Sequence, residues 1–133
     1  MKFFTKLTPL VALRAGLGLM YIYSGYDLFM YPQHWYGFLP SWLSRLAYQI
    51  GSVDAYLKFQ GAGECLMGVI FLMWFIKGKT LAVTAVLATL EMGLILIWVG
   101  IDPITFRDIG LLGASVAVLI MSSENNAEKQ WSV

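Results

Sequence analysis

Six ionisable side chains stand inside or at the edges of long apolar stretches of this sequence. They are Arg14, Asp27, Glu64, Glu91, Arg107 and Asp108. A charged Arg, Lys or Asp at the centre of a membrane helix costs about 2.5–3.5 kcal/mol. Such groups therefore need a charged partner, a water-lined cleft or a place near the membrane surface. They are candidates either for ligand binding or for contacts that hold helices in register.

Helical geometry places most of these groups in one half of a membrane. With a rise of about 1.5 Å per residue, Arg14 lies near the inner end of the first helix and Glu91 near the midplane. The other four lie toward the outer end. Arg107 is the only cation among those in the outer half, so we predict that it pairs with Glu64. Glu91 and Asp108 are its alternative partners.

Glycines share the faces of these charges. The expected stripes are Arg14, Gly18, Tyr21 and Gly25 on the first helix, Gly61, Glu64, Cys65 and Gly68 on the second, and Arg107, Gly110 and Ala114 on the fourth. Small residues let membrane helices approach closely, so these stripes are predicted to face the bundle interior. Asp27 lies off the first stripe and is expected among lipid headgroups without a partner.

The chain has one cysteine, Cys65, and one histidine, His34. These counts exclude an internal disulfide, a Cys-x-x-Cys redox centre and a haem held between two histidines of the chain. We also expect no metal site. Cys65 is expected to be a small buried residue and His34 a surface residue. The chain thus shows no complete catalytic centre, its catalytic residues stay unknown, and no covalently bound cofactor is expected.

Four apolar stretches must position these side chains. They cover residues 10–30, 58–76, 80–100 and 104–121, each close to the ~20 residues that a helix needs to cross a bilayer. The chain is 59% apolar and 13% charged, against about 45–50% and about 25% in soluble domains. Since no barrel-like alternation is seen, we predict an all-α bundle of four transmembrane helices. Residues 1–121 form its single domain, and residues 122–133 form a flexible polar cytoplasmic tail.

Positive charges predict the orientation of the bundle. Lys2, Lys6, Lys77, Lys79 and Lys129 fall on one side of the predicted spans, whereas the other side has Arg45, Lys58 and Arg107. The positive-inside rule places both termini in the cytoplasm, with the chain in the cytoplasmic (inner) membrane. No basic block occurs, so nucleic acid is not an expected partner.

The outer connection, residues 31–57, is rich in aromatic side chains. It contains Trp35, Tyr36, Phe38, Trp42, Tyr48 and Tyr56. Apolar spacing within residues 40–48 predicts a short amphipathic helix lying in the outer interface. This loop is either a plain aromatic anchor at the headgroups or part of a ligand pocket. In the second case Asp27, His34, Trp35, Tyr36 and Cys65 are the candidate pocket or interface residues.

Several short motifs resemble the DoxX-like family of small four-helix membrane proteins. They are LRAGLGLM (13–20), YSGYD (23–27), PQHWYGFLP (32–40), GAGECLMG (61–68) and DPITFRDIGLLG (102–113). Each motif is short, and their order and spacing carry the resemblance. It covers about nine-tenths of the chain. One departure is Leu28, which stands where the family often has a lysine, so any role of that lysine does not carry over.

The resemblance implies a membrane subunit that works beside a redox protein near the quinone pool. Family members resemble subunits of a thiosulfate:quinone oxidoreductase or partners of enzymes that handle thiols and oxidative stress. Arg14, Glu64, Arg107 and Asp108 would be the retained polar positions, and a quinone would be the ligand. Any oxidoreductase activity would need a partner subunit, since no electron carrier is encoded here.

Two other functions are compatible with the residues. A buried Glu91 in a four-helix protein suits a small proton-coupled transporter or channel working as a homo-oligomer. Glycine-lined helix faces equally suit a structural or assembly subunit packed into a larger membrane complex.

Overall fold

The chain folds into helices joined by short links. The computed structural model describes the backbone of residues 8–131 and the side chains of residues 8–124. No strand occurs in that range, which confirms the all-α prediction for the described residues. The elements are α1 (Pro9–Met30), the 3₁₀ helix η2 (Pro32–Phe38), α2 (Ser41–Ile50), α3 (Val53–Leu72), α4 (Lys79–Trp98), the 3₁₀ helix η3 (Thr105–Arg107) and α5 (Asp108–Trp131).

The helices differ from the predicted stretches mainly at their ends. α3 begins earlier than the predicted residue 58, because Ser52 Oγ accepts the backbone N–H of Ala55 at 3.1 Å and caps the first turn. α2 agrees with the short helix predicted at 40–48. α5 continues to Trp131, through the segment predicted as a tail. The predicted inner charges Lys2 and Lys6 lie outside the described residues, as does the side chain of Lys129.

α1 and α3 form one tightly packed pair. A Cβ built on Gly25 would lie 2.6 Å from the carbonyl oxygen of Gly61, and a Cβ on Gly68 would lie 2.9 Å from that of Gly18. The two backbones therefore touch at positions where only glycine fits. Burial of the predicted stripe on the first helix is confirmed, since Arg14, Gly18, Tyr21 and Gly25 are all buried.

α4 and α5 form a second pair, which packs on α1. Thr89 Oγ1 donates to Ser115 Oγ at 3.1 Å across the α4–α5 contact. A common core joins the pairs and contains Leu17, Tyr21, Phe71, Leu81, Ala85, Ala88 and Val118. The predicted inner stripe of the fourth helix is wrong. Arg107 and Gly110 are exposed, and α5 instead buries Asp108, Ser115 and Val118, because these follow one helical face.

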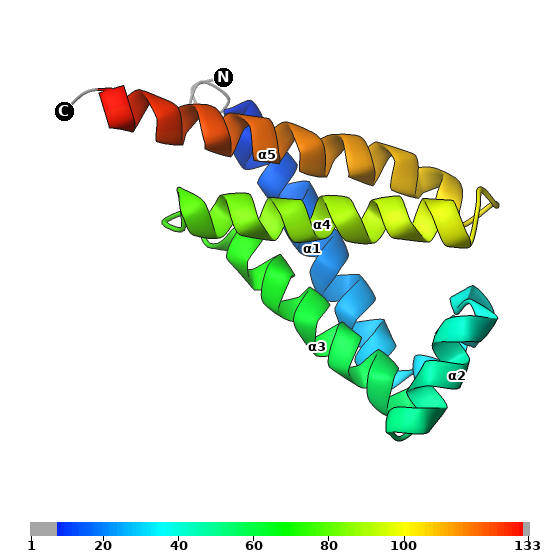
Figure 1. Cartoon of the computed structure of the whole chain (residues 1–133). Coiled ribbons are helices and arrows are strands. Elements are labelled where there is room, and N and C mark those ends of the chain that lie inside the picture. Colours follow the sequence, from blue (N-terminus) through cyan, green and yellow to red (C-terminus); the bar gives the residue numbers. More distant parts are fainter. Residues whose placement is uncertain (1–7, 132–133) are drawn as a thin grey trace.

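The two pairs diverge toward one end of the molecule. Figure 1 shows α3 and α4 close together at the link that joins them and far apart at their other ends, with α2 beside the open end. There Trp42 of α2 packs edge-on against Trp98 of α4, with ring centroids 5.2 Å apart. A small second core of Leu28, Ala47, Val53 and Leu57 lies beneath α2.

The link between α4 and η3 is held by one carboxylate. Asp102 Oδ1 accepts the backbone N–H groups of Ile104 and Thr105, both at 2.7 Å. Thr105 Oγ1 in turn donates to the carbonyl of Gly100 at 2.6 Å. The hydrogen bonds from the Thr105 and Ile104 backbone hold the pKa of Asp102 below its usual value. This local cap starts the last helix.

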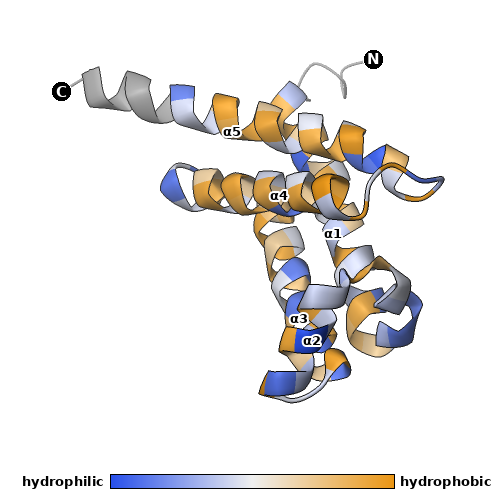
Figure 2. Cartoon of the chain, turned by 45° about the vertical axis from the view of Figure 1, so that its right-hand side comes forward, coloured by the Kyte–Doolittle hydropathy of each residue, from blue (hydrophilic) through white to orange (hydrophobic). Residues whose placement is uncertain are grey.

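Two helical segments, Lys79–Trp98 and Thr105–Glu124, are long and apolar enough to cross a membrane. Only 28% and 22% of the most apolar stretch of each segment is buried inside the molecule. The core helices of a soluble protein, by contrast, are mostly buried. Figure 2 shows hydrophobic residues along most of both helices. α1 and α3 do not qualify as spans by the same criteria of length and composition. Composition therefore supports two membrane spans and does not show the four that were predicted.

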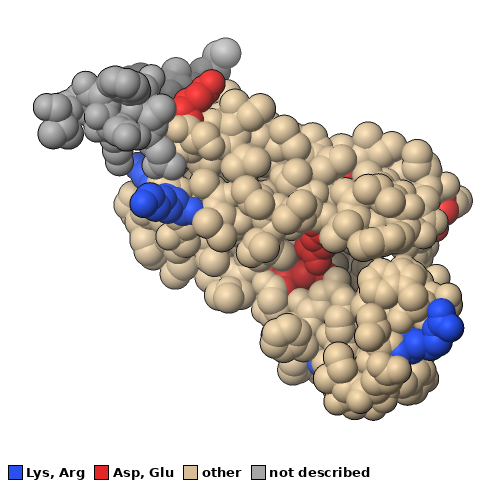
Figure 3. Space-filling view, viewed as in Figure 1, with Lys and Arg blue, Asp and Glu red and all other residues tan. Residues whose placement is uncertain are grey.

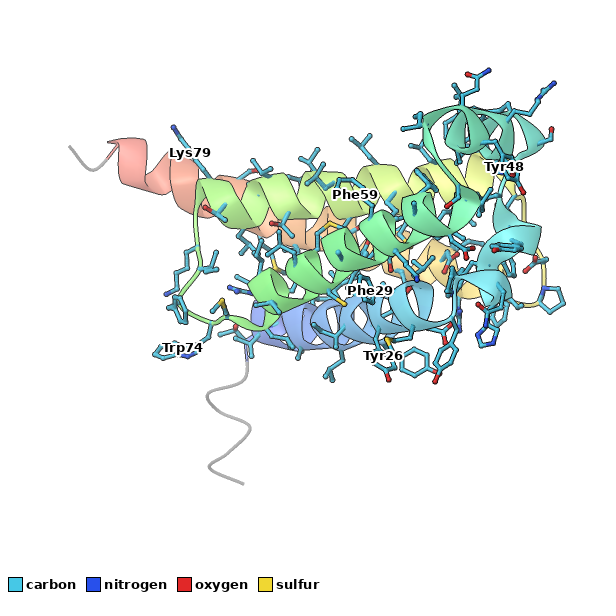
Figure 4. The ribbon with its side chains drawn as sticks, turned by 90° about the horizontal axis from the view of Figure 1, so that it is seen from below. Tyr26, Phe29, Tyr48, Phe59, Trp74 and Lys79 are labelled. Carbon is cyan, nitrogen blue, oxygen red and sulfur yellow. The ribbon has the colours of Figure 1, made fainter. Side chains whose placement is uncertain are left out.

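Large apolar side chains cover much of the outside. Phe59 is 80% exposed and Ile97 is 75% exposed. Figure 4 labels further outward-pointing aromatic side chains, including Tyr48 at one end of the molecule and Trp74 at the other end, where Lys79 also lies. A soluble monomer rarely exposes contiguous apolar surface on this scale, so the outer face is suited to lipid or to another protein.

Candidate functional site

An apolar cleft opens between the diverging helix pairs. It encloses about 770 Å³, a size typical of small-molecule sites. Its lining comes from α1, η2, α2, α3, α4 and the start of α5, and it includes the aromatic rings of Trp35, Phe38, Tyr56 and Trp98. Figure 3 shows acidic side chains within a hollow on this side of the molecule. The cleft exists because α3 and α4 separate and the aromatic loop does not fill the space.

Two carboxyl groups from different helices meet at this cleft. Gln60 Nε2 donates to Glu64 Oε1 at 3.4 Å and to Glu91 Oε1 at 3.2 Å. Gln60 and Glu64 are four residues apart on α3 and so share a face, whereas Glu91 comes from α4. The second oxygen of each carboxyl group, Oε2, is buried without a hydrogen-bond partner. The site therefore presents unused acceptor atoms at the edge of an apolar cavity.

Arg107 does not pair with either glutamate. Among the described residues no ion pair joins it to Glu64 or Glu91, so the predicted Arg107–Glu64 bridge is wrong. Arg107 lies at the end of η3 and is exposed, although it borders the cleft. Asp108, the next residue, is buried and also borders the cleft. The turn at η3 directs Asp108 inward, and the arginine stays at the rim.

Arg14 lies at the opposite end of the α1–α3 pair and binds backbone instead of carboxylates. Its Nε donates to the Phe71 carbonyl at 2.9 Å, and its Nη1 donates to that of Ile76 at 2.9 Å. Its Nη2 donates to the carbonyls of Met73 at 2.6 Å and Ile70 at 3.2 Å. The last carbonyls of a helix lack intrahelical partners. Arg14 therefore caps α3, and its predicted place in the polar cluster is wrong.

Asp27 has two partners in the aromatic loop, which corrects the expectation that it has none. Its Oδ2 accepts the indole N–H of Trp35 at 2.8 Å and lies 3.3 Å from His34 Nδ1. His34 also stacks on Tyr31, with centroids 5.4 Å apart. Because Trp35 lines the cleft, Asp27 holds one wall of the candidate site in place.

Tyr36 and Cys65 lie away from the cleft. The Tyr36 hydroxyl donates to the Asp54 carboxylate, and this hydrogen bond raises the pKa of Tyr36. Tyr36 thus ties η2 to the start of α3. Cys65 is half-buried at the α1–α3 contact, where its sulfur lies 3.9 Å from the Ile22 carbonyl oxygen. A Cβ on Gly25 would come within 2.8 Å of that sulfur, so Cys65 is a packing residue.

Gln60, which joins the two glutamates, was not predicted as a site residue. Its spacing could have identified it, since Gln60 stands four residues before Glu64 on one helical face. The wall residue Trp98 was also missed, because its distance from the loop in sequence hides their proximity. No group of three or more His, Cys, Asp or Glu side chains that could hold a metal ion occurs within the described residues.

Comparisons with protein-family models, with curated proteins and with solved structures found no match to this chain. Membership of the DoxX-like family therefore stays a prediction from the sequence motifs. What the molecule does has to be inferred from the cleft and from the surface around it.

Proposed function

We propose that the chain is a DoxX-like integral membrane protein with four spans, and that it serves as the membrane subunit of a redox assembly near the quinone pool. In this proposal the cleft receives the head group of a quinone or quinol. The electron carrier belongs to a partner subunit in this proposal, because a sequence with one cysteine and one histidine encodes neither a Cys-x-x-Cys redox centre nor a haem site with two histidines. The observation that carries the proposal is the pair of carboxyl groups, from the buried Glu64 and the half-buried Glu91, at an aromatic, apolar cleft.

The surface supports the membrane part of this proposal. α1 has 22 residues and α3 has 20, so each extends for about 30 Å, enough for the hydrocarbon layer. Their two buried charged groups have protein contacts, since Arg14 caps α3 and Glu64 accepts from Gln60. Interfacial aromatics at both ends, such as Tyr48 and Trp74, match the belts of membrane proteins.

The proposed orientation follows from the lysines. Lys77 and Lys79 lie at the α3–α4 end, and this end faces the cytoplasm by the positive-inside rule. The cleft, η2 and α2 then lie toward the outer leaflet. Both termini are cytoplasmic if all four long helices cross the bilayer.

The chemistry of the cleft supports a quinone-type ligand. Quinone sites need apolar and aromatic walls with a few polar atoms for the two ring oxygens. Here the rings of Trp35, Phe38 and Trp98 supply the walls, and the free oxygens of Glu64 and Glu91 supply the polar atoms. Either carboxyl group accepts a hydrogen bond from a quinol hydroxyl when ionised and donates one to a quinone carbonyl when protonated.

A binding titration tests this proposal. The full chain in lipid nanodiscs is titrated with decyl-ubiquinone and decyl-ubiquinol while quenching of tryptophan fluorescence is followed. We expect saturable quenching that Glu64→Gln weakens about tenfold or more, since a hydrogen bond to a charged group contributes about 1.5–3 kcal/mol. The matched control is Glu124→Gln, because Glu124 is exposed on α5 and does not border the cleft.

Recovery of the chain in mild detergent tests the partner. A co-purified flavin, haem or iron–sulfur protein is the expected result. No saturable quinone binding, together with no redox partner, would overturn the proposal. Loss of a membrane complex on deletion of the chain, with unchanged turnover per remaining complex, would instead show an assembly subunit.

A further inference from the structure

Within the part of the chain that the structure describes, the Glu64–Glu91 pair has no compensating cation. Glu64 is only 4% exposed, and the only ion pair within the described residues joins His34 to Asp27. Two carboxylates that share one amide donor in a low-dielectric setting cannot both stay charged at small cost, because they repel each other and have left water. The pair must be neutralised by protons or by a cation that enters the site.

The surrounding elements do not supply that cation. The other ionisable groups that border the cleft are Tyr23 on α1, Tyr56 on α3, the exposed rim residue Arg107, and Asp108, which adds a further acidic group. From α1, the Tyr21 hydroxyl donates to the Ala88 carbonyl at 3.4 Å. From α4, Lys79 borders a different hollow, near the opposite end of the helix. The polar base of the cleft is therefore acidic.

A second hollow reaches the same pair from the other side. It encloses about 690 Å³ between α3 and α4, and it is bordered by Lys79, Thr80 and Thr84 as well as by Gln60, Glu64 and Glu91. The Glu64–Glu91 pair therefore borders two cavities. The cleft lies on the side of the aromatic loop, and the second hollow lies on the side of the α3–α4 link. A group bound at the pair has two possible directions of approach.

We infer that the Glu64–Glu91 pair is an exchange site at which a hydrophobic organic cation and protons displace one another. The ligand class is a single positive charge on an aromatic or branched apolar body. The carboxyl oxygens neutralise the charge, and the rings of Trp35, Tyr56 and Trp98 pack on the body and add cation–π attraction. Binding one monovalent cation releases about one proton, and no covalent bond forms or breaks. This inference rests on the proposed membrane location but not on a quinone ligand.

Equilibrium binding to the full chain in nanodiscs tests the inference. The probe is methyltriphenylphosphonium, and its neutral counterpart triphenylphosphine oxide is the matched control ligand. Nanodiscs without protein give the lipid background. We expect phosphonium affinity to rise with pH by up to about tenfold per unit between pH 5 and 8, as competition with one proton requires. The neutral ligand should bind weakly and with little dependence on pH. Calorimetry in two buffers of different ionisation enthalpy counts the released protons.

Substitutions at Glu64 and Glu91 test whether the pH-dependent phosphonium binding occurs at this pair. Glu64→Gln and Glu91→Gln should each weaken phosphonium binding at least tenfold and flatten its pH dependence, whereas Glu124→Gln should change neither. Equal binding of the neutral ligand, or pH-independent phosphonium binding to the native chain, would overturn the inference even if a variant fails to fold. Phosphonium binding without quinone binding would reject only the quinone proposal, and quinone binding without phosphonium binding would reject only this one.

Discussion

A buried ionisable side chain in this chain contacts whatever group its helix brings within reach. Arg14 caps the carbonyl end of α3, where it donates to four backbone carbonyls. Glu64 and Glu91 share the amide of Gln60 because the three side chains face the same gap between α3 and α4. Arg107, predicted as their counter-ion, stays at the rim. Residue type therefore indicates which groups need a partner, while the opposing helix determines which partner they have.

Replacing Arg14 should destabilise the α1–α3 pair. We expect Arg14→Met to lower the free energy of unfolding by about 3 kcal/mol or more, since each buried polar group left unpaired costs about 1–3 kcal/mol. Arg14→Lys should cost less, because an ammonium group still donates to some of these carbonyls. Thermal unfolding is followed by the reaction of a fluorogenic maleimide with Cys65, the only cysteine.

Arg45→Met is the control for this experiment, because Arg45 is exposed on α2. It should leave the unfolding temperature within about 1–2 °C of the native value. Equal destabilisation by the Arg14 and Arg45 replacements would contradict the capping role.

At the scale of elements, two helix pairs with different contacts shape the molecule. α1 and α3 touch through glycines, so their backbones lie close. α4 and α5 contact through the Thr89–Ser115 hydrogen bond and share the common core that contains Ala88 and Val118. The cleft lies where the α1–α3 pair diverges from the α4–α5 pair. Because the α1–α3 contact fixes the position of α3, the shape of the cleft depends on that contact.

Alanine substitutions should separate contact glycines from the others. Gly61→Ala should destabilise the protein by about 1–3 kcal/mol, because its Cβ would lie 2.6 Å from the Gly25 carbonyl oxygen, a backbone atom that cannot move alone. Gly63→Ala, two residues away on the same helix, meets nothing within 4 Å. It should be neutral or stabilising by up to about 1 kcal/mol, because alanine favours helix more than glycine does.

Unfolding temperatures of the two variants, measured side by side in the same detergent, give the comparison. Similar values for Gly61→Ala and Gly63→Ala would show that the close α1–α3 approach is absent in the folded protein.

At the scale of the whole molecule, the outside is apolar and the charged groups lie at the ends or inside. The two ends of the molecule differ, because the cleft and the loop with Trp35 lie at one end, whereas Lys79 and Trp74 lie at the other (Figure 4). This asymmetry fits a bundle that crosses a bilayer, with its ligand cleft in one leaflet. It also fits a subunit whose apolar faces contact a partner.

Thiol labelling should distinguish four spans from two. In a Cys65→Ala background, Ile50→Cys lies at the end of α2, where the native side chain is 88% exposed, and Lys77→Cys lies in the α3–α4 link. With four spans, a membrane-impermeant maleimide should reach these two positions from opposite sides of a proteoliposome membrane. If only α4 and α5 cross the membrane, both positions should react from the same side.

Local sequence properties predicted the five α-helices, but not the start of α3 or the end of α5. Apolar runs of about twenty residues, without strand alternation, led to the positions of α1, α4 and α5, and the apolar spacing of residues 40–48 led to α2. Glycine spacing on the first helix predicted its buried face. These features depend on residues three or four apart, which a helix brings together whatever the rest of the chain does.

Only the tertiary structure decided which polar groups meet. The sequence alone determined that Glu64, Glu91 and Arg14 would need partners, because apolar surroundings make any unpaired charge costly. It did not determine that Gln60 joins the two glutamates, that Asp27 holds Trp35, or that Arg14 caps α3. Those pairings link residues on different elements, and each depends on how the elements concerned pack against one another. That packing involves the whole bundle, and no single stretch of sequence encodes it.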